Sequence, residues 1–114
     1  MTIQQIKELT SATTVCGIND PGKEIRYAFA SDLMSDVLRL DFTDVILITG
    51  LCNLQTIRTA EMAEVSCLLF VRGKRVTDEM KELATENNMI LLETEYSMYR
   101  TVGELYTHGL LPVY

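Results

Sequence analysis

The sequence has little of the chemistry on which enzymes and metal proteins most often depend. It contains one histidine, His108, and three cysteines without C-x-x-C spacing, Cys16, Cys52 and Cys67. Three dispersed thiols and one distant imidazole would form an irregular zinc site, so we interpret the cysteines as reduced thiols that pack as small hydrophobic residues. His108 directly precedes Gly109 at the end of a predicted helix, where an imidazole interacts favourably with the helix dipole. We therefore expect no metal site and no cofactor.

Catalytic motifs are lacking as well. No serine or cysteine lies in a recognisable nucleophile elbow, and no glycine spacing matches a P-loop or a dinucleotide fingerprint. The acid pairs Asp20 with Glu24 and Glu93 with Glu95 have no accompanying base, and placement on the surface explains them. These absences predict a protein that is not an enzyme.

Positive charge and long apolar runs are also scarce. Ten basic residues face sixteen acidic ones, which gives a formal net charge of −6, and the densest basic cluster is Arg72, Lys74 and Arg75. The contiguous cationic stripe that binds nucleic acid or an anionic membrane is therefore not expected. The longest apolar runs, residues 45–48 and 67–71, have the length of strands, and the first residues contain no secretion signal. We expect a cytoplasmic protein that binds neither nucleic acid nor membrane.

What the sequence does contain is a regular alternation of strand and helix signals. Apolar or β-branched stretches predict strands at residues 12–17, 25–29, 45–49, 66–71 and 89–92, and residues 19–22 predict a turn. Helices are expected to begin at the capping residues Thr2, Ser31 or Asp32, Asn53, Thr77 and Ser97. The buried face of the second helix is expected to carry Leu33, Met34, Val37 and Leu38. Strands that alternate with helices and are apolar throughout are typical of a parallel sheet covered on both faces. We predict one domain over residues 1–114 with an α/β fold, in which three α/β/α layers surround a largely parallel sheet of about five strands.

The order of motifs from residue 12 to residue 109 resembles a known family. In residues 27–37, Tyr-Ala-Phe-Ala-Ser-Asp-Leu-Met-Ser-Asp-Val, a strand runs into a Ser-Asp-Leu segment. Thr49-Gly50 ends the next strand, Gly73-Lys74 follows another, and residues 90–94 and 102–106 complete the series. This order is similar to that of the single-domain members of the DRTGG family, which are related to the amino-terminal domain of HPr kinase/phosphorylase. Arg72 stands where the family usually has the first of two glycines.

The resemblance implies a bacterial regulatory or dimerisation module without a known reaction. The family occurs beside ligand-sensing CBS domains in certain inorganic pyrophosphatases and within long phosphotransacetylases. Stand-alone copies are typical of anaerobic, fermentative bacteria, often among genes for hydrogenases or signalling kinases. We therefore expect that this chain can have a partner protein encoded in such a gene cluster.

The strand-to-helix junctions are the expected place for a ligand. In an open parallel sheet the carboxyl ends of the strands meet at one edge, where ligands bind. Helix amino termini and basic side chains at this edge would favour an anion, and we predict a small phosphate-bearing ligand, such as an adenine nucleotide. Capping, tight turns and solvation are the competing explanations for the same residues. The predicted ligand-binding residues are Ser31, Asp32, Thr49, Gly50, Asn53, Arg72, Gly73, Lys74 and Thr94.

The last helix and the apolar tail suggest how the chain associates. Tyr99 and Tyr106 are seven residues apart and share one helix face, and residues 110–114 cannot continue the helix past Pro112. The tail either folds back onto its own core or, with the tyrosines, contacts a second copy. Our leading hypothesis is a homodimeric, non-catalytic regulatory module that senses a small anionic ligand and reports to a partner protein. The alternatives are a pure protein-interaction scaffold in a hydrogenase or kinase signalling cluster and, with less support, a cryptic enzyme acting on phosphorylated metabolites.

Overall fold

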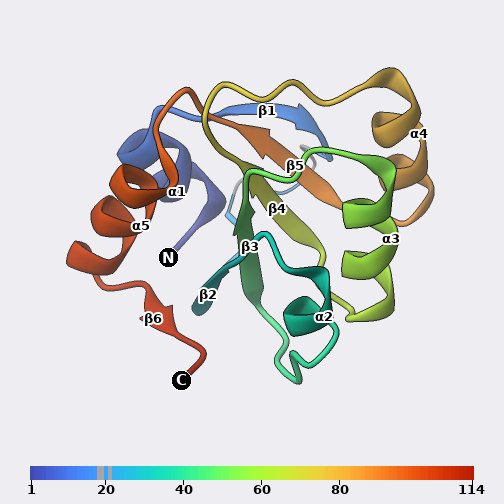
Figure 1. Ribbon diagram of the computed structural model, residues 1–114. Coiled ribbons are helices and arrows are strands. Elements are labelled where there is room, and N and C mark those ends of the chain that lie inside the picture. Colours follow the sequence, from blue (N-terminus) through green and yellow to red (C-terminus); the bar gives the residue numbers. More distant parts are fainter. Residues whose placement is uncertain (18–19, 21) are drawn as a thin grey trace.

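The computed structural model describes residues 1–17, 20 and 22–114, and it contains one mixed sheet (Figure 1). The sheet is six-stranded and its order is β1-β5-β4-β3-β2-β6. All neighbouring pairs are parallel except β1 and β5, which are antiparallel. The strands are β1 (Thr13–Cys16), β2 (Tyr27–Ala30), β3 (Val45–Thr49), β4 (Cys67–Phe70), β5 (Ile90–Glu93) and β6 (Leu111–Pro112). The prediction of a largely parallel sheet is confirmed, and the sixth strand comes from the tail.

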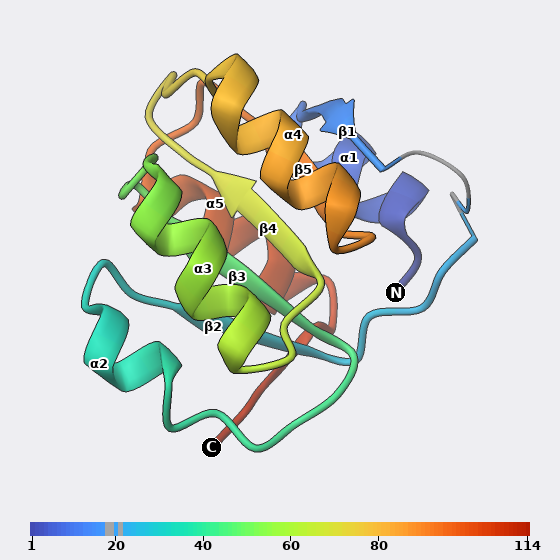
Figure 2. The same ribbon diagram turned by 90° about the vertical axis from the view of Figure 1, so that its right-hand side faces the viewer.

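Helices cover both faces of the sheet, which confirms the three-layer arrangement. One face is covered by α1 (Ile3–Thr10) and α5 (Met98–Thr107). The other face is covered by α2 (Met34–Val37), α3 (Leu54–Met62) and α4 (Asp78–Glu86), which lie in front of the sheet in Figure 2. No helix among the described residues is long and apolar enough to cross a membrane.

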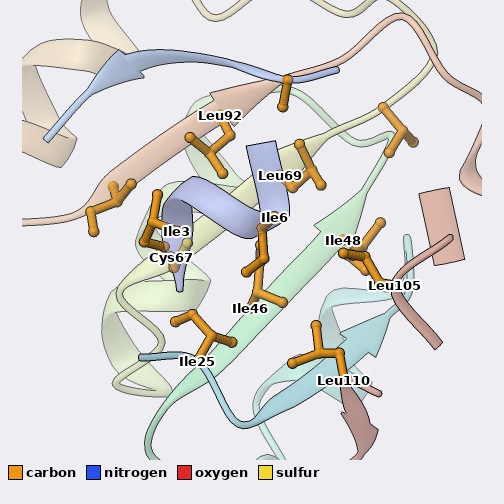
Figure 3. Packing of buried hydrophobic residues seen from close by; sticks show 13 residues of the cluster. Ile3, Ile6, Ile25, Ile46, Ile48, Cys67, Leu69, Leu92, Leu105 and Leu110 are labelled. Atoms are coloured by element: carbon orange, nitrogen blue, oxygen red, sulfur yellow. The ribbon is translucent and has the colours of Figure 1, made fainter. Parts of the chain in front are cut away.

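The core divides into two clusters because side chains alternate along each strand. Ile46 and Ile48 of β3 pack with Ile3 and Ile6 of α1 on one face, as Figure 3 shows. Leu47, between them, packs on the α3 side instead. Every residue of β3 and β4 is buried. These two central strands are therefore apolar throughout, since water reaches neither face.

The predicted helix caps are right for four helices and wrong for α2. Thr2 forms a capping box with Gln5, and Asn53, Thr77 and Ser97 each accept a hydrogen bond from the first turn of their helix. The helix α2 has only four residues, and its N-cap, Leu33, makes no side-chain capping bond. Because so short a helix has little buried face, Leu33 and Leu38 are exposed at 58% and 47%, contrary to prediction, and only Val37 is fully buried.

The tail folds back onto its own chain. Leu110 is buried, Leu111 and Pro112 pair with β2 opposite Tyr27 and Ala28, and the Tyr114 ring lies 6.4 Å from the Phe29 ring. Within one chain, this segment therefore folds back onto the core and extends the sheet. The predicted turn at 19–22 falls partly outside the described residues, because residues 19 and 21 are not among them.

Candidate functional site at the carboxyl ends of the strands

The parallel register of β2, β3, β4 and β5 brings the loops that follow them to one edge of the sheet (Figure 1). Asp32 follows β2, Gly50 follows β3, Arg72 follows β4 and Thr94 follows β5. This is the arrangement on which the predicted ligand site depends, and it is present.

Asp32 is the centre of the best-connected cluster at this edge. Its Oδ1 accepts hydrogen bonds from Thr49 Oγ1 at 2.9 Å and from the Gly50 main-chain N–H at 2.7 Å. The Gly50 N–H bond is the largest influence on the pKa of Asp32 and lowers it. Burial acts in the opposite direction, and the Thr49 hydroxyl and the charge of Arg72 lower the pKa further. Asp32 is therefore a carboxylate that the next strand holds in its ionised form.

Arg72 closes this cluster from the loop after β4. Its Nη2 lies 3.9 Å from Asp32 Oδ2 and donates a 3.4 Å hydrogen bond to the Gly50 carbonyl. A side chain at Gly50 would overlap the guanidinium, so glycine permits the close approach. About half of each side chain, 52% for Arg72 and 51% for Asp32, remains exposed. The ion pair is therefore loose and open to a competing ligand group.

The backbone of the Arg72 loop explains a feature of the family pattern. Arg72 and Gly73 both have left-handed backbones, with φ of 64° and 71°. Glycine adopts this conformation without steric cost, which accounts for paired glycines there. The turn aims two N–H groups at the loop after β5: Arg72 N donates to Tyr96 O at 2.8 Å and Gly73 N to Thr94 O at 3.0 Å. The loops after β4 and β5 are therefore joined by main-chain bonds.

A second cluster at the same edge was missed by the sequence interpretation. The sequence predicts two surface acids without an accompanying base, which is wrong for Glu93: Arg75 Nη1 lies 3.2 Å from Glu93 Oε1, and Arg75 Nη2 contacts Glu95 Oε1. Glu93 is only 7% exposed, and its Oε2 accepts a 2.6 Å hydrogen bond from Val76 N. The hydrogen bond to Glu93 is the largest cause that raises the pKa of Arg75. The available signal was a charged residue that ends an apolar strand, since a buried carboxylate requires a partner.

The other predicted residues are occupied by local structure or exposed. Asn53 caps α3 through Thr56, and Ser31 Oγ accepts a hydrogen bond from Leu33 N. Thr94 is buried and donates to Thr10 O at 2.6 Å. Lys74 is exposed, and its ammonium makes no hydrogen bond or ion pair within residues 1–17, 20 and 22–114. The structure thus brings together Asp32, Thr49, Gly50 and Arg72, with Lys74 on the same loop as Arg72.

The charges at this edge are mixed rather than uniformly positive. Arg75 is engaged by Glu93 and Glu95, whereas Arg72 and Lys74, on the loop after β4, have capacity for another anion. Asp32 offers carboxylate oxygens that accept hydrogen bonds from hydroxyl groups. The arrangement therefore suits a ligand that carries both anionic groups and hydroxyl groups.

Comparison with known proteins supports the fold. No protein-family model matches the sequence, and no curated protein matches it. A similar solved structure is that of the CBS and DRTGG domains of the regulatory region of Clostridium perfringens pyrophosphatase complexed with the activator diadenosine tetraphosphate. It aligns with 98% of this chain at a TM-score of 0.75 and 20% sequence identity, and this chain spans 48% of its length. At this identity the likeness concerns the fold, and it confirms that the chain has a DRTGG-like fold.

Proposed function

We propose that this chain is a non-catalytic regulatory module that senses a small phosphate-bearing ligand, such as an adenine nucleotide, at the carboxyl-end edge of its sheet. The observation that carries the proposal is the convergence of Asp32, Thr49, Gly50 and Arg72 from three successive loops, with Asp32 and Arg72 half exposed. Arg72 and Lys74 would donate to phosphate oxygens, and the ionised Asp32 would accept hydrogen bonds from ribose hydroxyls.

The same cluster offers a route by which occupancy changes the protein. Asp32 lies two residues before the short helix α2, and the main-chain N–H of Arg72 donates to the loop after β5. A ligand that contacts both side chains would connect the loops after β2, β4 and β5. Such a ligand stabilises the conformation to which it binds, and a partner protein that recognises that conformation responds.

The non-catalytic part of the proposal is supported by the kind of protein that shares the fold. The similar solved structure is a regulatory region bound to a nucleotide activator. The acid pair of Glu93 and Glu95 is engaged by Arg75, so it serves the fold in the described conformation rather than offering a free base. Homodimerisation through the exposed face of α5 completes the proposal.

A thermal-shift experiment tests the ligand site. ATP, AMP, diadenosine tetraphosphate, pyrophosphate and acetyl phosphate are each added to the full chain, and a bound ligand raises the melting temperature by mass action. We expect a shift with at least one nucleotide that is lost in the Arg72→Gln/Lys74→Gln variant. The control is Arg58→Gln, which removes an exposed cation from the middle of α3. A shift of equal size in the double variant, or no shift with any compound, contradicts the proposal.

A protein-interaction scaffold is the second candidate, and a specific observation favours it. Large apolar side chains are exposed on α5 and the tail: Tyr99 at 91%, Tyr106 at 67%, Leu111 at 56% and Tyr114 at 94%. Apolar surface of this kind marks contact sites when it is contiguous. Retention of a protein partner that is lost in Tyr99→Ser, together with no ligand shift, would favour the scaffold.

A further inference from the structure

An apolar cavity lies beside the edge of the sheet, under the tail. Its volume is about 260 Å³, and it lies between β2, α5 and the tail. Ala28, Ala30, Ile48, Val102, Leu105 and Leu110 contribute to its wall, and Figure 3 shows Ile48, Leu105 and Leu110 close together beside β2. Since a closed cavity of about 150 Å³ accommodates benzene, this one has room for a larger planar ring system.

One wall of the cavity is an unpaired strand edge. Tyr27 N donates to Asp44 O and Ser31 N donates to Ile48 O, so the N–H groups of these two residues point toward β3. Because peptide groups alternate in direction along a strand, those of Ala28 and Ala30 point the other way, toward β6. The strand β6 pairs only with Tyr27 and Ala28. No main-chain hydrogen bond joins Ala30 to the tail among the described residues. Ala30 therefore offers one N–H donor and one C=O acceptor at the wall of an otherwise apolar space.

Two residues that line the cavity directly precede the polar cluster in the chain. They are Ala30 and Ile48, and the residues that follow them in the chain are Ser31, Asp32 and Thr49. The aromatic rings of Phe29, Tyr106 and Tyr114 also line the cavity. A group that enters the cavity from the carboxyl-end edge would thus have its remaining atoms beside Asp32.

We propose that this cavity is the base subsite of the nucleotide site and that it holds an adenine ring. Adenine is planar, stacks on aromatic side chains and carries an amino donor beside a ring-nitrogen acceptor, which matches the paired donor and acceptor of one edge peptide. The ribose then lies at Asp32 and the phosphates at Arg72 and Lys74. This inference rests on the proposed nucleotide-sensing function and specifies which part of the nucleotide each group recognises.

Calorimetric titration of the full chain with three probes separates the two halves of the site. The probes are adenosine, which lacks phosphate, tripolyphosphate, which lacks the base, and ATP, which has both. The test variant is Ala30→Phe, which fills the cavity from an exposed position. The control is Thr13→Phe, which places the same ring on an exposed position of the opposite edge strand, β1. We expect Ala30→Phe to raise the Kd of adenosine and of ATP by about tenfold or more and to leave that of tripolyphosphate unchanged.

The outcomes distinguish this inference from the function on which it rests. Equal Kd values for ATP and tripolyphosphate, both unaffected by Ala30→Phe, overturn the base subsite and leave the phosphate site standing. Adenosine binding that Ala30→Phe abolishes, with no binding of tripolyphosphate, supports the base subsite and overturns the phosphate contacts. Failure of all three probes to bind overturns both. In the unmodified chain, adenosine should shift the amide resonances of Ala30 and Val102, and unchanged resonances there overturn the subsite whatever the variant does.

Discussion

The carboxylate of Asp32 accepts a 2.7 Å hydrogen bond from the main-chain N–H of Gly50, eighteen residues further along the chain. The same oxygen accepts a 2.9 Å hydrogen bond from the hydroxyl of Thr49. Two loops that lie beside each other at the edge of the sheet are therefore fastened by one carboxylate oxygen. The proposed ligand site and part of the stability of the fold depend on the same group.

Replacing Asp32 by Asn should destabilise the protein in a pH-dependent way. Charged hydrogen bonds contribute more than neutral ones, but Asp32 is half exposed, so we expect a loss of about 1 kcal/mol at neutral pH. The pKa of Asp32 is lowered in the folded protein from its ordinary value of 3.8, so this stabilisation is present above that value and disappears as the pH falls through the lowered pKa. Urea unfolding of both proteins at pH 7 and at pH 3 or below measures the difference.

The matched control is Asp36→Asn, which removes an exposed carboxylate from α2 in the same part of the chain. We expect it to leave the free energy of unfolding nearly unchanged at both pH values. A difference between the parent and Asp32→Asn that is the same at pH 7 and at low pH would show that the charge of Asp32 is not the cause.

The sequence was sufficient for the fold and for the location of the edge cluster, and physical reasons explain why. Strands buried on both faces, such as β3 and β4, are apolar throughout and easily recognised. The parallel topology that such strands imply then places Asp32, Thr49 and Arg72 at one edge. The role of Asp32 within the cluster could not be predicted in the same way. Its contact with Gly50 is made by tertiary structure and leaves no trace in the local sequence, which indicates only a possible helix cap.

The backbone of Arg72 predicts an unusual order of stability among its variants. A residue other than glycine at φ of 64° bears a cost of about 1 kcal/mol that glycine avoids. Both Arg72→Ala and Arg72→Gly remove the contacts with Asp32 and Gly50. The alanine variant keeps the backbone cost, whereas the glycine variant removes it. We therefore expect Arg72→Gly to be more stable than Arg72→Ala by about 1 kcal/mol, measured by urea unfolding. An alanine variant as stable as the glycine variant would contradict the left-handed conformation.

The two acids that share Arg75 should differ sharply in their importance. The side chain of Glu93 is 8% exposed and that of Glu95 is 70% exposed. Glu93→Gln removes a buried charge that holds both Arg75 and the Val76 N–H, so we expect a loss of about 2 kcal/mol in the free energy of unfolding. Glu95→Gln removes an exposed charge from the same arginine and should change stability little. Equal losses in the two variants would show that burial of Glu93 is not what matters.

The Glu93 cluster shows where sequence interpretation reaches its limit. Arg75 and Glu93 are eighteen residues apart, one in the loop after β4 and the other at the end of β5, so no local pattern relates them. Their contact follows from the register of β4 and β5, in which Phe70 stands opposite Glu93. Register depends on packing across the whole sheet, and the sequence predicts which strands exist more readily than how they align. The cavity beside Ala30 was missed for the same reason, because it requires the pairing of the tail with β2.

Homodimerisation is expected to depend on the exposed face of α5. Light scattering at micromolar concentrations should give twice the chain mass of 12.9 kDa. Tyr99, which is 91% exposed and does not line the cavity beside Ala30, is the most direct test position. Tyr99→Ser should shift the population toward the monomer, because it removes apolar area from the contact. A parent protein that is monomeric across this concentration range would remove dimerisation from the proposed function.

The three cysteines should report on local and global opening of the fold. Cys67 is fully buried in β4, and burial raises its pKa to about 12. Because the thiolate is the reactive form, Cys67 should react with a disulfide reagent only when the molecule unfolds. Cys16 and Cys52 are partly exposed, and the pKa of Cys52 is raised by burial and by the negative charge of Glu93. In native buffer at pH 8 we expect these two thiols alone to react, Cys52 slowly, and all three to react in urea. Cys67→Ala should leave the number of thiols that react in native buffer unchanged and lower the number that react in urea by one. Reaction of Cys67 faster than global unfolding would mean that a local opening of the sheet exposes β4.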